Sequence, residues 1–328
     1  MKGRNRFPHQ CSLSLRSLYY ALLLVLWLPL VGQAQRPSAC DLASEESKSK
    51  FLNDQKPGSI LVFNKYTSNP IRQLEDTYIS ITNVHAMYDI DLHMFFVDGS
   101  TGNIADLYLP LGPNQTRTFA ASDVDPGVEG FMFAIATYGG IPTGFNYLVG
   151  EAALYEIDGF EATLPALAIG KMTSGDVNLN EDQTATMLFD GCMYERLPQV
   201  VAVPSFNSQV VFRTYVTLVT PPSSFLGNQV SATKIAATVT NDRVQAASTN
   251  LTMRRFRQLA LAEIRFNADL NLLVPANGTG WLKFQATEEQ PLLGALFNKG
   301  PRFKGGRNLA AVSLLKKFAL TVPTDPPQ

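Results

Sequence analysis

The chain has few of the residues that build metal and nucleophilic centres. It contains 3 cysteines, 3 histidines and 2 tryptophans among 328 residues. Neither a Cys-x-x-Cys pair nor a Gly-x-Ser-x-Gly string occurs, and the nearest match to the latter, Gly99 to Gly102, has the composition of a turn. No glycine-rich phosphate loop is present either. These absences argue against the common zinc, thiol-redox, serine-hydrolase and nucleotide-binding classes, and we expect no catalytic residue, no metal site and no cofactor.

Acidic residues are missing from the N-terminus, since none precedes Asp41. A basic segment is followed by an apolar run from Leu18 to Val31 and then by the small residues of Gly32-Gln33-Ala34. This order is typical of an export signal cleaved after Ala34. The run is shorter than the roughly 20 residues that cross a bilayer as a helix. We therefore predict a signal peptide over 1–34 and an exported chain, extracellular, at the cell surface or in the periplasm, with no integral membrane span.

Two cysteines, Cys40 and Cys192, follow the predicted signal. In an oxidising compartment they can form a disulfide, which in the chain-entropy model restricts the unfolded chain by about 5 kcal/mol. Two separate, partly buried thiols are the alternative. The sequence does not decide between them.

Charge is divided unevenly along the chain. Residues 35–195 carry 8 basic and 22 acidic residues, a net charge of −14, whereas residues 196–328 carry 15 and 6, a net charge of +9. Either the halves face each other, or the basic half meets an external polyanion, or both are simply solvated surfaces. Nucleic acid is not an expected partner, because export separates the chain from it.

Short runs rich in branched and aromatic residues, separated by Gly, Pro, Asn and Asp, fill the chain after Pro57. This pattern predicts a mainly β protein, an antiparallel Ig-like β-sandwich in two tandem units with at most short helices. In residues 89–97, Ile90, Leu92, Met94 and Phe96 fall on one face and Asp91 and His93 on the other, which favours a sheet with one wet face. The expected strands cover 59–66, 77–84, 89–97, 104–110, 115–122, 130–138, 145–151, 185–191, 198–206, 209–219, 229–240, 280–287 and 291–297.

The expected organisation has five parts. They are a signal peptide (1–34), a polar linker (35–56), an acidic sandwich (57–195), a basic sandwich (196–323) and a tail (324–328). Residues 160–171 have helical spacing and predict a short helix, while residues 253–266 fit a helix or a strand equally well.

One comparison suggests an internal repeat. A turn, then a Gly-aromatic strand ending in Ala-Thr, then a strand containing a Gly occur at 113–151 and again at 275–300. The match is short, and it would make the two halves copies of one unit.

The strings GSILVFNKYTS, YISITNV, LHMFFVDGST, ASDVDPGVEGF, FNYLVGE and GWLKF resemble those of a group of uncharacterised exported bacterial β-rich proteins. The likeness covers nearly the whole chain after the signal. It implies a bacterial, exported setting, and it assigns no activity and no functional residue.

Basic residues provide the strongest functional signal. One group lies in the Gly-rich stretch 298–308 and the other at 254–257. Arg and Lys on loops can bind sulfate, carboxylate or phosphate groups. The predicted polyanion-binding residues are Lys299, Arg302, Lys304, Arg307, Arg254, Arg255 and Arg257.

Acidic residues are also paired in many loops, for example Asp123 with Asp125. Glycosidases use two carboxyl groups at a defined separation, and loop-rich strands supply such pairs by chance. We therefore expect a non-catalytic exported protein with an adhesion, structural or ligand-binding role that contacts an anionic polysaccharide or envelope component. The alternative is a carbohydrate-active or other hydrolase with a site built from scattered loop carboxylates. The sequence leaves the ligand, the oligomeric state and the docking of the halves open.

Overall fold

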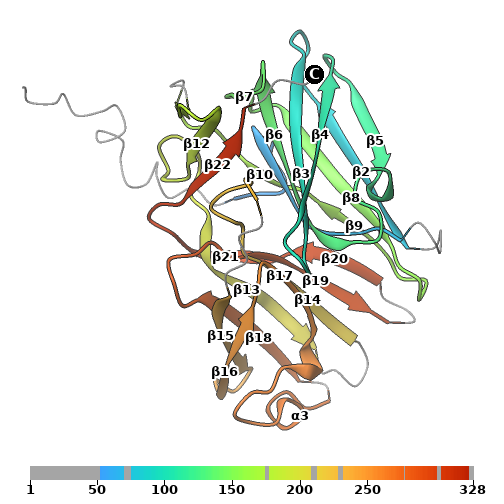
Figure 1. The fold of residues 1–328 in the computed structure, drawn as a ribbon. Coiled ribbons are helices and arrows are strands. Elements are labelled where there is room, and N and C mark those ends of the chain that lie inside the picture. Colours follow the sequence, from blue (N-terminus) through green and yellow to red (C-terminus); the bar gives the residue numbers. More distant parts are fainter. Residues whose placement is uncertain are drawn as a thin grey trace, which may run out of the picture. The chain divides into compact units, whose positions relative to one another are not determined.

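The computed structural model describes residues 52–69, 75–173, 177–207, 213–227, 232–276, 278–300 and 304–324. All of them belong to one compact unit, Ala43–Gln328. The predicted signal peptide, most of the polar linker and almost all of the tail lie outside these residues. The described chain is nearly all antiparallel β-structure, which confirms the predicted fold class (Figure 1).

Two sheets form the first sandwich. Sheet I has the strand order β10-β1-β6-β3-β4, with the short β7 beside β6, and sheet II has the order β5-β2-β8-β9. The strands of sheet I are β10 (Leu167–Ile169), β1 (Ile60–Thr67), β6 (Glu129–Tyr138), β3 (Ile90–Asp98), β4 (Ile104–Leu111) and β7 (Ile141–Pro142). Those of sheet II are β5 (Thr116–Ala120), β2 (Asp76–Asn83), β8 (Leu148–Tyr155) and β9 (Glu161–Pro165).

The second sandwich is built in the same way. Sheet III has the order β16-β15-β18-β13-β21, and sheet IV the order β17-β14-β19-β20. The strands of sheet III are β16 (Ala246–Met253), β15 (Thr233–Asn241), β18 (Thr279–Ala286), β13 (Pro198–Asn207) and β21 (Ala310–Leu314). Those of sheet IV are β17 (Phe256–Ala260), β14 (Arg213–Val219), β19 (Leu293–Lys299) and β20 (Lys304–Asn308).

The strand orders confirm the predicted repeat. Each strand of sheets I and II, apart from β7, has a counterpart at the same place in sheets III and IV. Even a bulge is shared: the pairing of β1 with β6 shifts between Phe63 and Tyr66, and that of β13 with β18 shifts between Val203 and Phe206. Beyond each bulge a glycine, Gly130 or Gly280, faces the aromatic residue. The two sandwiches are therefore copies of one unit.

A fifth, small sheet connects the ends of the two halves. In sheet V, β12 (Thr184–Leu188) pairs with β11 (Asn178–Leu179) on one side and with β22 (Ala319–Pro323) on the other. Strand β22, from the second half, thus pairs with β12 of the first half, across the boundary predicted at residue 195. The limits of the two domains otherwise stay predictions. Sheet V residues Met187 and Leu320 share a buried cluster with residues of sheet I.

That contact overturns one expectation. Residues Ile90, Leu92, Met94 and Phe96 do face the core between sheets I and II. The opposite face of β3 is not wet, because Phe95 and Val97 are buried in the cluster with sheet V, and His93 is only 2% exposed. A strand in the middle of a covered sheet needs apolar residues on both faces, and the alternation in 89–97 reported only one of them.

Helices are few and short. The predicted helix over 160–171 is wrong, since β9 and β10 occupy it and Pro165 ends β9. The ambiguous segment 253–266 is mainly strand β17 followed by the 3-10 turn η2 (Leu261–Glu263). The others are η1 (Ala121–Asp123) and α3 (Leu270–Leu273). None of the described helices has the length and apolar content to cross a membrane.

Replacing Gly130 with alanine is expected to destabilise the first sandwich. An added Cβ would lie 1.9 Å from the carbonyl oxygen of Val97, so β3 and β6 would have to move apart. Overpacking of this kind costs about 1–3 kcal/mol, measurable by urea unfolding. Gly305→Ala is the matched control, because no neighbouring atom lies within 4 Å of its Cβ position. Equal stability of the two variants would contradict the close approach.

Candidate functional site

Two predicted basic residues of the 298–308 group contact the acidic half of the chain. Lys299, at the end of β19, pairs with Glu156 and, at 3.5 Å, with Asp158. Its side chain is only 14% exposed. Lys304 donates a hydrogen bond to the carbonyl of Gly159. At these contacts the two halves of the chain face each other. Arg302, which was also predicted to bind a polyanion, lies outside the described residues.

The other basic group lies at the opposite edge of sheet IV, next to β17. Arg254 donates to the carbonyl of Ser100 at 3.3 Å, and Arg257 to that of Thr252 at 2.8 Å. Arg255 is buried, and burial lowers the pKa of its guanidinium. Sheet IV therefore separates the two predicted groups instead of combining them.

Arg307 lines a cavity of about 430 Å³. Its guanidinium donates to the carbonyl of Ser205 at 2.7 Å. The other polar groups come from β13, β14, β19 and β20, and none of the described lining residues is acidic. We call this the Arg307 cavity, and its polar lining residues are Ser205, Asn207, Thr214, Asn298 and Arg307.

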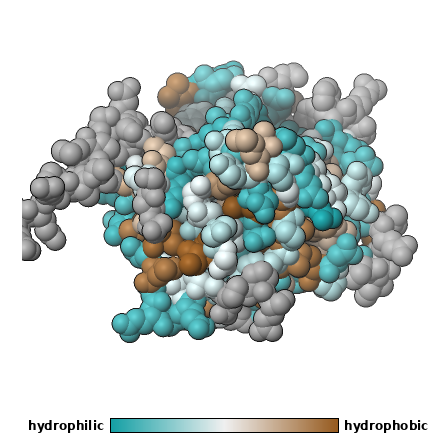
Figure 2. Space-filling view, turned by 90° about the horizontal axis from the view of Figure 1, so that it is seen from above, coloured by the Kyte–Doolittle hydropathy of each residue, from teal (hydrophilic) through white to brown (hydrophobic). Residues whose placement is uncertain are grey.

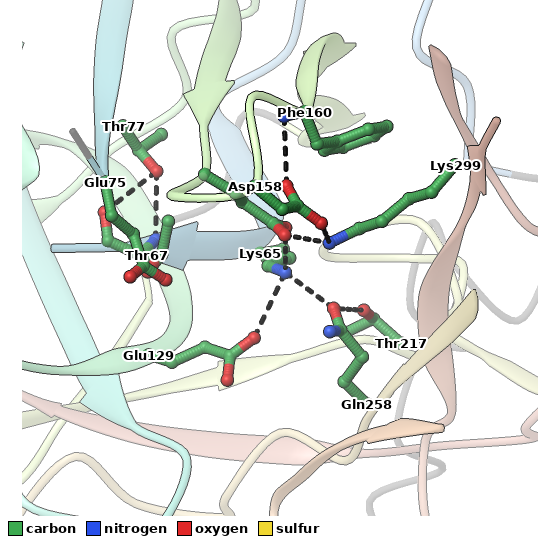
Figure 3. Close-up of polar contacts among 11 residues, drawn as sticks. Lys65, Thr67, Glu75, Thr77, Glu129, Asp158, Phe160, Thr217, Gln258 and Lys299 are labelled. Carbon is green, nitrogen blue, oxygen red and sulfur yellow. Dashed lines mark hydrogen bonds and ion pairs between the residues drawn. The ribbon is translucent and has the colours of Figure 1, made fainter. Parts of the chain in front are cut away.

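A buried ion network joins the two sandwiches (Figure 3). Lys65 on β1 is 2% exposed, and its ammonium lies 2.7 Å from Glu156, 3.1 Å from Glu129 and 2.5 Å from Gln258 of β17. Glu156 also accepts from Lys299 of β19. One carboxylate thus holds two ammonium groups from different sandwiches. Sequence reasoning missed Lys65, because nothing near residue 65 marks it as buried.

The loop carboxylates Asp98 and Asp125 accept hydrogen bonds within the fold. Tyr66 donates to Asp125 at 2.6 Å, and Asp98 accepts from Ser100 and Thr101. Burial would raise the pKa of Asp98, but these hydrogen bonds outweigh burial and lower it. Burial raises the pKa of Asp125 more than the Tyr66 hydrogen bond lowers it, and the charge of Asp98 raises it further. Asp123 is exposed in η1.

The histidines have structural contacts. The ring of His93 stacks on Tyr108 at 4.0 Å and bonds Asp106 at 2.9 Å. In His85, Nδ1 accepts from the backbone amides of Met87 and Tyr88. Within the described ranges, no three His, Cys, Asp or Glu residues gather as a metal site would require.

Cys192 is disulfide-bonded. It follows β12 in a turn that Asp190 stabilises by accepting the amide hydrogen of Cys192 at 2.8 Å. Cys192 is therefore not a separate thiol. The other cysteines of the chain lie outside the described residues, so the pairing with Cys40 stays a prediction.

A tyrosine-lined cleft on sheet II was not predicted. Tyr78 of β2 and Tyr155 of β8 are 48% and 40% exposed, and their rings meet edge to face with centroids 5.8 Å apart. The cleft that they line has a volume of about 740 Å³. The alternation of residues 77–84 places Tyr78 on the outer face of its strand, which is a sequence signal for this cleft. That Tyr155 lies beside Tyr78 follows only from the register of β2 with β8.

Hydrophobic residues form several patches on the face of the molecule that is seen from above. Figure 2 shows this face from above, with brown hydrophobic residues in separate patches between teal hydrophilic ones. Tyr138 and Met87 are the most exposed aromatic and sulfur-containing side chains in the described chain, at 81% and 73%. The residues coloured in this view do not form one broad apolar surface of the kind that docks a partner.

The comparisons with known proteins do not identify a family. No protein-family model matches the chain, and no curated protein is similar to it at a significant level. A solved structure assigned as a β-galactosidase from Bacteroides fragilis has 8% identity and a TM-score of 0.15, and covers 79% of this chain and 32% of its own. The viral chemokine-binding protein R17 of rodent gammaherpesvirus Peru has 8% identity and a TM-score of 0.17, and covers 81% and 88%. At these TM-scores neither likeness carries an argument.

Proposed function

We propose that the chain is an exported, non-catalytic ligand-binding protein with Ig-like sandwiches, cleaved after Ala34, that acts in adhesion or structure at the cell envelope or outside the cell. Its ligand is an anionic polysaccharide, and the Arg307 cavity holds one of its sulfate or carboxylate groups. The observation that carries this proposal is a guanidinium in a cavity whose described lining residues include amides and hydroxyls but no acid.

The chemistry of the cavity supports an anion. The guanidinium of Arg307 has donors beyond the one used on Ser205, and a planar fork of donors matches an oxyanion. Asn207 and Asn298 add amide groups, and the backbone at Gly305 and Gly306 leaves room for close approach. Lys299 and Arg255 are less suited to an external ligand, because the first is ion-paired and the second is buried.

Arg307→Ala should weaken binding of heparin, used as a sulfated polysaccharide, by about 10-fold, because a hydrogen bond to a charged group contributes about 1.5–3 kcal/mol. The measurement is titration calorimetry on the full exported chain at about 50 and about 300 mM salt. Binding should weaken as salt rises, since exposed charges are screened over about 8 Å at physiological salt.

Arg257→Ala is the control, because Arg257 also donates to a backbone carbonyl but lies at the opposite edge of sheet IV. It should leave the affinity unchanged. Heparin binding that ignores salt, or that falls equally in both variants, would refute the assignment to the Arg307 cavity.

A further inference from the structure

The outer face of sheet II is flat and rich in hydroxyl groups. Residues of β2 alternate between buried and outward positions. Outward hydroxyls pair across strands: Ser80 with Thr118 at 2.8 Å, and Thr82 with Thr116 at 2.7 Å. The two tyrosines, Tyr78 and Tyr155, stand on the same face, because Tyr78 lies opposite Ala153, two residues from Tyr155.

The tyrosine cleft lies at one end of this face. Two exposed rings at 86° to each other present both a ring face and a ring edge to the cleft. Asp76 lies directly opposite Tyr155 on β2, and Glu161 directly opposite it on β9. All three residues line the cleft, together with Asn69 and Ser122. Aromatic faces next to carboxylate and amide groups are suited to a ligand with apolar C–H faces and many hydroxyls.

Charge selects against anions here. The carboxylic acids Asp76, Glu156 and Glu161 line the cleft, and no described lining residue is Lys or Arg. Asp76 accepts from Ser122 and Glu156 from Lys65, so both carboxylates are already held in place. An exposed carboxylate, Glu161, remains to accept from a ligand hydroxyl. A sulfated or uronic polymer would meet repulsion at this place.

The cleft continues along the sheet. A second cavity of about 220 Å³ shares Tyr155 and Glu161 with it and reaches Thr163 and Lys304. The two cavities form a trough that runs from β2 across β8 and β9. Two adjoining cavities accommodate a chain of units better than a single small molecule.

We propose that this trough binds an uncharged polysaccharide, with sugar rings stacked on Tyr78 and Tyr155 and ligand hydroxyls donating to Glu161. The tyrosine cleft does not depend on the proposed anionic ligand, because it shares no described lining residue with the Arg307 cavity; the second cavity of the trough meets the Arg307 cavity at Gly305. A neutral polymer at the two tyrosines and an acidic polymer at Arg307 thus have different contact residues on one molecule.

Affinity electrophoresis of the full exported chain tests the proposal in gels containing one of four neutral polysaccharides: hydroxyethylcellulose, a β-1,3-glucan, galactomannan or amylopectin. The wild-type chain should be retarded by at least one of them. The double variant Tyr78→Thr/Tyr155→Thr should bind about 10-fold more weakly, as expected for the loss of two aromatic contacts. Threonine is used because it suits exposed strand positions.

Two controls isolate stacking from folding. Tyr155→Phe keeps the ring and should keep retardation, and Tyr138→Thr removes a tyrosine that is 81% exposed but does not line the cleft. Retention of heparin binding by the double variant shows that it is folded and that the two sites are separate. The proposal is overturned if none of the four polysaccharides retards the wild-type chain, or if the double variant and Tyr138→Thr behave alike.

Discussion

Lys65→Met is expected to lower the free energy of unfolding by about 3–5 kcal/mol, the range for removing one partner of a buried ion pair. Lys65 is 2% exposed and lies 2.7 Å from Glu156, whose side chain is 11% exposed. Methionine preserves an unbranched stem and its packing but leaves the Glu156 carboxylate without the buried ammonium. Urea unfolding of the full chain, followed by tyrosine and tryptophan fluorescence, measures the loss.

Glu129→Gln is the matched control. Glu129 also pairs with Lys65, at 3.1 Å, but its side chain is 43% exposed. Exposed pairs contribute about 0–1 kcal/mol, so this variant should differ little from wild type. Adding Glu156→Leu to Lys65→Met should not recover the loss, because Glu156 also pairs with Lys299, whose side chain is only 14% exposed. Equal losses in Lys65→Met and Glu129→Gln would show that burial of Lys65 contributes nothing to the pairing.

Cys192→Ser is expected to have an effect of similar size. For a bond between Cys40 and Cys192, the chain-entropy model gives a loss of about 5 kcal/mol, because the closed loop is long. Peptide mapping of the unreduced protein should recover a fragment linking the two cysteines. Reductant should destabilise the wild-type chain and leave Cys192→Ser unchanged.

The outcome also reports on the compartment, since a stable disulfide requires an oxidising one. A linked fragment that contains Cys11 would contradict both the pairing and the cleavage after Ala34. Thiol labelling of Cys192 in the native, unreduced protein would contradict the disulfide itself.

Much of the fold could be predicted, because local patterns carry it. Alternation and β-branched residues mark β1, β2 and β6 directly, and the Gly-aromatic strings at Gly130 and Gly280 revealed the repeat. The prediction failed where packing between distant segments determines which face of a strand is buried. The face of β3 that carries His93 was expected to be wet, but it is buried in the cluster shared with sheet V, whose strands lie far from β3 in sequence. The segment 160–171 failed because apolar spacing alone does not separate a short helix from two short strands.

The candidate sites were less accessible to sequence reasoning. The two basic groups were predicted as one set of polyanion-binding residues, yet pairing places Arg307 and Arg257 at opposite edges of one sheet. Tyr78 and Tyr155 are distant in the chain and meet only through strand register. Binding residues on a sheet face depend on pairing, which a single sequence does not specify.

Sheet V has a consequence for the order of folding. Its strand β22 is among the last residues of the chain, whereas the sheet I surface beside it is formed by residues that emerge much earlier from the ribosome or a translocation channel. Until β22 arrives, Phe131 and Phe133 lack part of their apolar cover. Transiently uncovered aromatic surface favours aggregation and recruits chaperones. The apolar cover of sheet I is therefore complete only after β22, which follows both sandwiches in the chain, has been synthesised.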